Sequence, residues 1–174
     1  IGLRLAINAS SIQFRNNLLF DTINQQIALH NWDPDMLEVE ITEGLLLDDS
    51  PEVMTYINEI NNRGVRLSVD DFGTGFSALS YLKNYPVSTV KIDRSFIMDL
   101  PEDKENEILV QAIVAMAHGL GLEVIAEGVE TLEQWRFLQS LGCDFAQGYY
   151  FGKPMPQTDF EDYLTKQQGI SAIA

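Results

Sequence analysis

The sequence predicts an α/β fold of the (β/α)8, TIM-like barrel class, truncated here to about six β/α units. Short strand-like runs alternate with helix-like stretches along all 174 residues, and no Pro/Gly/Ser-rich linker or charge block interrupts them. Each strand-like run has one apolar and one polar face, whereas an open parallel sheet covered by helices on both sides would need two apolar faces. Because a whole barrel typically takes about 250 residues, we expect about two β/α units to be missing.

Six strands are predicted from short apolar runs. They span Leu3–Ala9, Met36–Thr42, Val65–Asp71, Thr89–Ser95, Glu123–Gly128 and Phe145–Phe151. Successive side chains of a strand point to opposite faces, so alternate residues share a face. The polar faces of the first four strands carry Arg4, Ala6 and Asn8; Glu38, Glu40 and Thr42; Arg66, Ser68 and Asp70; and Lys91 with Asp93. We expect these faces to line the lumen of the barrel and the apolar faces to pack against helices.

Six helices are predicted between and after the strands. They span Phe14–His30, Pro51–Arg63, Ser77–Asn84, Lys104–Gly119, Leu132–Leu141 and Asp159–Gln168. Thr131 and Gln134 have the spacing of a capping box, which marks a helix start. Thr158 and Glu161 have the same spacing. These signals support the starts of the last two helices.

The composition excludes several classes of protein. With 11 basic and 26 acidic residues the formal charge is −15, so neither a nucleic-acid polymer nor a membrane surface is an expected partner. The single cysteine, Cys143, excludes an internal disulfide framework and fits a reducing, cytoplasmic compartment. No apolar run approaches the roughly 20 residues of a membrane span. Because Ile1-Gly2 opens the chain without Met, we expect a piece of a longer protein, whose membrane anchorage stays open.

Polar residues gather at the carboxyl ends of the predicted strands, which form the catalytic mouth of such barrels. They are Asn8, Glu40, Asp70, Asp71, Lys91, Glu127, Glu130 and Gln147. Two carboxylates about 4 Å apart repel by about 4 kcal/mol at an effective dielectric constant near 20, so the cluster needs cations, protons or solvent. Oxygen ligands of this kind suit Mg²⁺, Mn²⁺ or Ca²⁺. Two ions sharing Asp70 would match a two-metal phosphoryl site, with Lys91 beside a metal-bound water or a developing oxyanion.

Each of these signals also has a structural interpretation. Asp70-Asp71 before a glycine-rich turn is by itself more often a solvated turn, and the Asp71–Phe76 loop lacks the lysine and spacing of a phosphate-binding loop. His30 and His118 lie on predicted helices, away from any Ser or Cys nucleophile at a strand end, and Cys143 is interpreted as a small buried hydrophobe. The joint placement of the polar residues at strand ends favours the metal site.

Six motifs are similar, in this order, to those of EAL-domain cyclic di-GMP phosphodiesterases. They are Asn8-Ala9-Ser10, Glu40–Glu43, Asp70–Ser77, Lys91–Phe96, Ala126–Thr131 and Gln147–Phe151. The chain resembles this family over almost its whole length. The resemblance implies a modified (β/α)8 barrel that hydrolyses one phosphodiester bond of cyclic di-GMP to give linear pGpG, with two Mg²⁺ or Mn²⁺ ions. Ca²⁺ is expected to inhibit, because it prefers more ligands and longer bonds than Mg²⁺.

The resemblance also implies roles for single residues. It makes Asn8, Glu40 and Asp70 ligands of a first ion, and Asp70, Asp71 and Glu127 ligands of a second. Lys91 is similar to the family lysine that contacts the hydrolytic water, and Lys91, Glu127 and Glu130 form the expected catalytic set. Glu43 resembles the residue that anchors the Asp71–Ser77 loop, which in the family links substrate binding to dimer contacts. The remaining expected substrate or loop contacts are Asp93, Arg94 and Gln147.

The chain departs from the family pattern in two respects. The Glu-Ala-Leu segment that names the family, whose Glu is a further metal ligand, lies N-terminal to everything here, so we expect this piece alone to be impaired or inactive. In the loop, Phe76 and Ala78 replace the commoner Tyr and Ser. The implied partners are cyclic di-GMP, a second copy in a homodimer, and a sensor or GGDEF domain upstream in the parent protein.

Two other functions stay open. One is a catalytically inactive cyclic di-GMP-binding regulatory module, although such receptors usually lose several metal ligands and every matched position is intact here. The other is a different barrel with an acidic mouth, such as an enolase-like metal enzyme acting on carboxylates.

Strand parity also predicts a charged cluster at the closed end of the barrel. Arg4, Glu38 and Arg66 lie one or two lumen positions below the expected metal ligands. Because unpaired buried charges are unfavourable, we expect Glu38 to lie between the two arginines in a cluster of net charge +1. The alternative is that all three side chains reach solvent at the barrel bottom.

Overall fold

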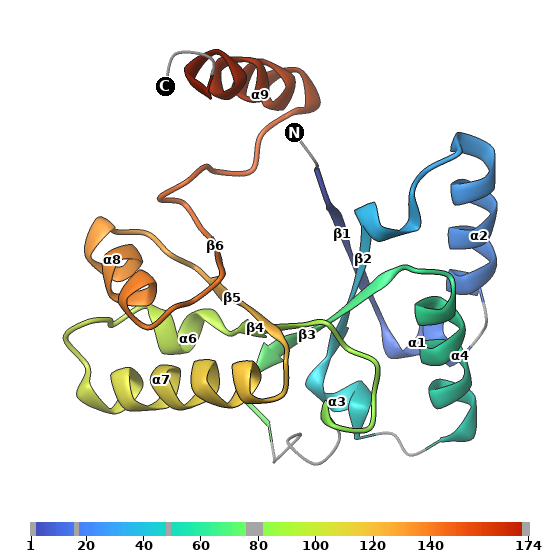
Figure 1. Ribbon diagram of the computed structural model, residues 1–174, viewed down its shortest axis with the longest axis horizontal. Helices are drawn as coiled ribbons and strands as arrows, with labels where there is room; N and C mark the ends of the chain where they lie inside the picture. The colour runs from blue at the N-terminus through green and yellow to red at the C-terminus, as the bar shows by residue number, and fades with distance from the viewer. Residues whose placement is uncertain (1–2, 16–17, 48–49, 76–81, 172–174) are drawn as a thin grey trace.

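The structure is a computed structural model that describes residues 3–15, 18–47, 50–75 and 82–171. In these residues six parallel strands form a curled half-barrel with the order β1-β2-β3-β4-β5-β6 (Figure 1). The strands are β1 (Leu5–Ala9), β2 (Leu37–Thr42), β3 (Arg66–Phe72), β4 (Thr89–Ile92), β5 (Glu123–Glu127) and β6 (Phe145–Gln147). The predicted class and the six predicted strands are therefore confirmed.

Helices alternate with the strands along the chain. They are α1 (Ser11–Arg15), α2 (Leu18–His30), the 3-10 helix η1 (Pro34–Met36), α3 (Glu43–Leu46), α4 (Pro51–Asn62), α6 (Arg94–Ile97), α7 (Lys104–Gly119), α8 (Leu132–Ser140) and α9 (Gln157–Ser171). In Figure 1, α1, α2 and α4 lie beside the first three strands, α6, α7 and α8 lie beside the last three, and α9 stands apart. In the described part of the chain, no helix has the length and apolar character that a membrane span needs.

The core lies between the outer faces of the strands and these helices. Alternate strand residues such as Val39, Leu67 and Val90 are fully buried and belong to one cluster with helix residues such as Ile57 and Val114. Burying each such side chain stabilises the fold by roughly 1.5–3 kcal/mol. Apolar residues therefore alternate along the strands because one strand face packs against the helices, as predicted. The opposite faces line the lumen.

Parallel register places residues of neighbouring strands at the same height. Asn8 pairs with Glu40, Thr42 with Asp70, and Glu127 with Gln147. The carboxyl ends of these strands therefore meet at one edge of the half-barrel, as the sequence predicts.

Several predicted element boundaries are wrong. The fourth strand ends at Ile92 instead of Ser95, because the Asp93 side chain accepts a hydrogen bond from the Ser95 backbone N–H and starts α6. The sixth strand ends at Gln147 instead of Phe151, and the chain turns at once.

The helix predictions also need correction. The predicted helix Phe14–His30 corresponds to parts of α1 and α2, with residues 16 and 17 outside the described ones, and the predicted helix Ser77–Asn84 falls mainly on residues 77–81, which are also outside them. The capping box of Thr131 and Gln134 is present. Thr158 is not a cap, because α9 already begins at Gln157.

Candidate active site

A lysine lies at the centre of the acidic mouth. The Lys91 ammonium group, on β4, is 2.7 Å from Glu40 Oε1 of β2, 2.7 Å from Glu127 Oε1 of β5 and 3.1 Å from Asp70 Oδ1 of β3. Four neighbouring strands thus bring one cation and three carboxylates to a single point. The structure places these four residues, all named from the sequence, next to one another.

Burial and charge act against each other at this point. Lys91 is only 3% exposed; burial alone would lower the pKa of its ammonium group, but hydrogen bonds to Glu127 and Glu40 raise it above the ordinary value. Burial raises the pKa of Glu127, and the bond to Lys91 only partly offsets this. Three carboxylates face one ammonium group, so the centre keeps an excess of negative charge.

Asp71 lies at the edge of the same centre. It follows Asp70 in an irregular stretch of β3, where the register against β4 shifts, and its φ of 55° is unusual for a residue other than glycine. Burial, and next the charge of Asp70, raise the pKa of the Asp71 carboxyl above its ordinary value, with further influence from Asp93 and Lys91. Asp71 therefore shares the electrostatic field of the mouth.

The other predicted residues lie around this centre. Asn8 is exposed at the end of β1, level with Glu40, and Gln147 is exposed at the end of β6, level with Glu127. The Arg94 guanidinium group is 3.0 Å from Glu130 Oε1 at the rim. The Arg94 side chain crosses Gly128, where an added Cβ would come within 2.3 Å of Arg94 Cγ. A groove of about 180 Å³ runs beside this pair, lined by Arg94, Glu127, Gly128, Glu130, Gln147, Gly148 and Tyr149.

Glu43 holds the loop that follows β3. Its buried carboxylate accepts hydrogen bonds from the backbone N–H groups of Gly73 and Gly75, both at 3.2 Å. A Cβ at Gly75 would approach the Glu43 carboxyl carbon to 3.0 Å, so glycine permits this close contact. The predicted contact between Glu43 and the loop is therefore present for residues 73–75, while residues 76 and 77 lie outside the described ones.

The donors at the mouth fit a hard divalent cation in their chemistry. They are carboxylate oxygens with an amide nearby, and Asp70 Oδ1 is buried without a hydrogen bond of good geometry. Among the residues that the structure describes, no group of three or more His, Cys, Asp or Glu side chains is already arranged as a metal shell. Three of the carboxylates lie around the Lys91 ammonium group, at 2.7–3.1 Å from its nitrogen atom.

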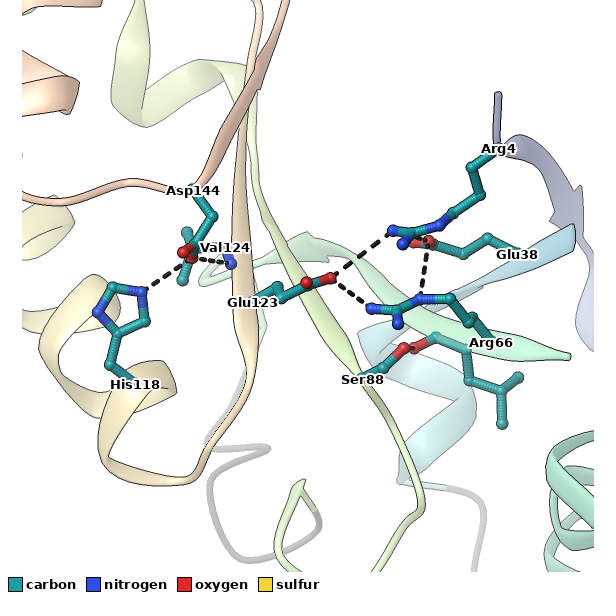
Figure 2. A network of polar contacts seen from close by, with 9 residues as sticks. Arg4, Glu38, Arg66, Ser88, His118, Glu123, Val124 and Asp144 are labelled. Atoms are coloured by element: carbon teal, nitrogen blue, oxygen red, sulfur yellow. Dashed lines mark hydrogen bonds and ion pairs between the residues drawn. The ribbon is translucent and has the colours of Figure 1, made fainter. Parts of the chain in front are cut away.

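A second charged cluster lies at the opposite end of the lumen (Figure 2). Glu38 Oε2 is 3.3 Å from Arg4 Nη1 and 3.8 Å from Arg66 Nε, which confirms the predicted position of Glu38 between two arginines. Glu123 contacts both arginines as well, at 3.6 Å for Arg4 and through a hydrogen bond from Arg66. The cluster is therefore neutral, and the predicted charge of +1 is wrong.

Sequence reasoning missed Glu123 as a member of this lower cluster. The signal was present, because counting back by twos from Glu127 gives Ile125 and then Glu123 on the same face of the strand. Outside the lumen, His118 Nε2 lies 2.9 Å from Asp144 Oδ2, which also accepts the Val124 backbone N–H at 2.8 Å (Figure 2). This supports the structural interpretation of His118.

Cys143 is buried, and burial raises the pKa of its thiol to about 11. A thiol in this state is a poor nucleophile, which agrees with its interpretation as a small hydrophobe.

Comparison with known proteins identifies close relatives. Residues 1–154 match the EAL domain family. The chain is 41% identical to the bifunctional diguanylate cyclase/cyclic di-GMP phosphodiesterase MucR of Pseudomonas aeruginosa, over 87% of this chain and 22% of that protein. It is 39% identical to the cyclic di-GMP phosphodiesterase NbdA of the same organism, over 93% of this chain and 21% of that protein.

The fold agrees with a solved relative. The solved PaMucR phosphodiesterase in complex with c-di-GMP is 40% identical and superposes with a TM-score of 0.85, covering 90% of this chain and 64% of that one. The chain spans only about a fifth of the length of the curated relatives it matches.

Proposed function

This chain belongs to the EAL-domain family, and we propose that it acts in the hydrolysis of cyclic di-GMP to linear pGpG. The observation that carries the proposal is the convergence of Glu40, Asp70 and Glu127 on one point at the strand carboxyl ends. Relatives about 40% identical are named as cyclic di-GMP phosphodiesterases, and a solved relative is a complex with c-di-GMP.

We further propose that two Mg²⁺ or Mn²⁺ ions are the cofactors. The first would be held by Asn8, Glu40 and Asp70, and the second by Asp70, Asp71 and Glu127. When bound, such ions lower the pKa of a coordinated water and neutralise charge that develops on phosphoryl oxygens. The excess negative charge of the mouth supports this proposal, because the described residues supply only one ammonium group for three carboxylates.

The protein's own side chains would position the substrate and the attacking water. Lys91 places a positive charge next to Glu127, where it can orient a water molecule or stabilise an oxyanion. Arg94, held by Glu130, presents guanidinium donors at the rim groove, which suit a phosphate or the acceptor edge of a guanine base. Gln147 adds an amide group at the end of β6, the strand next to β5. Asp93 caps α6, the helix that carries Arg94.

We also propose an oligomeric state, accompanying domains and a cellular location. A homodimer, a sensor or GGDEF domain in the same protein and a cytoplasmic location would suit a signalling phosphodiesterase. The named dual activity of the relative MucR supports an accompanying cyclase domain.

A second function is favoured by one observation. The Lys91 ammonium group contacts Glu40, Asp70 and Glu127 and compensates part of their charge, which would also suit a catalytically inactive module that only binds cyclic di-GMP.

Turnover separates the two functions. The chain, extended upstream through the Glu-Ala-Leu segment that the resemblance implies, is incubated with cyclic di-GMP and Mg²⁺ or Mn²⁺, and the nucleotides are separated by chromatography. We expect pGpG to form, and we expect EDTA or excess Ca²⁺ to suppress it. Binding of cyclic di-GMP without turnover would instead support the inactive module, and turnover that resists EDTA would contradict the metal proposal.

A further inference from the structure

The Lys91 ammonium group lies among three of the carboxylates that are proposed to bind the divalent ions. It has three N–H donors, and three carboxylates on three different strands lie 2.7–3.1 Å away. Lys91 is 3% exposed, so bulk solvent screens these contacts little. In this arrangement Lys91 compensates the mutual repulsion of Glu40, Asp70 and Glu127.

The carboxylate oxygens that contact Lys91 belong to the side chains that would bind the divalent ions. A carboxylate lone pair that accepts a hydrogen bond from Lys91 is not free to coordinate an ion, and a divalent ion beside the ammonium group is repelled by its charge. An ammonium group and a divalent ion cannot occupy the same place. The two cations therefore compete for the same oxygen atoms.

We propose that the Lys91 ammonium group is a stand-in cation, which holds the three carboxylates together while divalent ions are absent and leaves at least one of them when ions bind. This rests on the proposed metal site and goes beyond it, because it makes Lys91 a positioning residue that opposes metal affinity. The apparent affinity of the mouth for divalent ions is then lower than its carboxylates alone would give.

The lower cluster supplies a matched control. Arg66 is also a cation on the lumen face of a central strand, but its contacts are Glu38 and Glu123 and not the carboxylates of the mouth. Removing its charge should disturb the fold without freeing a ligand of the divalent ions.

The test compares the intact protein with its Lys91→Met and Arg66→Met variants. The dissociation constant for Mn²⁺ is measured by electron paramagnetic resonance, and the thermal unfolding midpoint is measured with and without Mn²⁺. We expect Lys91→Met to bind Mn²⁺ about tenfold more tightly or better, within the usual range of coupling between two sites. Its unfolding midpoint should be lower than that of wild type without Mn²⁺ and should rise more when Mn²⁺ is added.

Arg66→Met should unfold at a lower temperature and bind Mn²⁺ as wild type does. If wild type binds no Mn²⁺, the proposed metal site fails. If wild type binds Mn²⁺ and Lys91→Met binds it equally or more weakly, the stand-in role is wrong while the metal site stands.

A measurement on wild type keeps the test independent of whether Lys91→Met folds. A lysine ammonium group that is buried and hydrogen-bonded exchanges its protons slowly, so Lys91 should give a resolved ¹⁵Nζ signal in nuclear magnetic resonance spectra. We expect saturating Mg²⁺ to shift or remove this signal. An unchanged signal when Mg²⁺ is bound would overturn the proposal.

Discussion

The two charged clusters of the lumen share strands β2, β3 and β5 and differ in net charge. The lower cluster pairs Arg4 and Arg66 with Glu38 and Glu123 and is neutral. The upper cluster sets three carboxylates against Lys91 and keeps an excess of two negative charges.

This difference in net charge indicates different roles for the two clusters. Charges that compensate one another within the fold need no ligand, whereas excess charge concentrated at a barrel mouth needs bound cations, protons or solvent. We therefore interpret the lower cluster as a structural closure and the upper cluster as the chemical site. The predictions below test this division, beginning with the largest expected effect.

Asp70→Asn should remove one of the converging charges and the proposed bridge between two ions. In the chain extended upstream through the Glu-Ala-Leu segment, we expect turnover of cyclic di-GMP to fall by about 10³-fold or more, with little change in thermal stability. Steady-state kinetics, with circular dichroism as the control for folding, measures this. Turnover close to that of wild type would remove Asp70 from the chemistry.

Glu38→Ala should leave two partly buried arginines facing only Glu123. We expect a loss of roughly 3–5 kcal/mol in the free energy of unfolding, the usual effect of breaking a buried ion pair. Glu123→Ala should lose less, because the Glu123 side chain is 38% exposed and the Glu38 side chain only 3%. Denaturation with urea measures both, and Mg²⁺ should restore neither. A loss within about 0.5 kcal/mol for Glu38→Ala would show that the cluster is solvated.

Asp144→Asn should weaken the link between His118 and β5 outside the lumen. Burial raises the pKa of Asp144, but hydrogen bonds from His118 and the Val124 N–H outweigh it and hold the pKa below 3.8. The stability that Asp144 contributes is therefore present above pH 3.8 and lost as the pH falls through the lowered value.

We expect Asp144→Asn to lose about 1 kcal/mol at pH 7, and we expect its difference from wild type to shrink below pH 3.8. Urea denaturation as a function of pH measures this, with exposed Asp162→Asn as the control. A difference that is constant with pH would contradict the charge-dependent contact.

The sequence predicts much of this division through strand parity. Alternation places Arg4, Glu38 and Arg66 low in the lumen and Glu40 and Asp70 at the mouth, and the structure agrees. Strand alternation predicts these positions because one face of each strand must be apolar where it packs against the helices. The polar residues therefore lie on the opposite face, which lines the lumen.

Other features depend on contacts that a single strand does not encode. The neutrality of the lower cluster requires Glu123, whose parity with Glu127 gives its face of the strand but not its contacts with the two arginines. The position of Lys91 between three carboxylates depends on the curl of four strands at once. The sequence predicts a longer strand in place of α6, because the apolar run continues past Ile92. In the structure the Asp93 side chain caps α6 and thereby ends the strand.

The central claim is that the upper cluster binds divalent cations and the lower one does not. Anomalous diffraction from crystals soaked in Mn²⁺ tests it most directly. We predict one or two manganese peaks within bonding distance of oxygen atoms of Glu40, Asp70 and Glu127, and none at the cluster of Arg4, Glu38, Arg66 and Glu123. An upper cluster without manganese at saturating Mn²⁺, with Lys91 still in contact with all three carboxylates, would contradict the account.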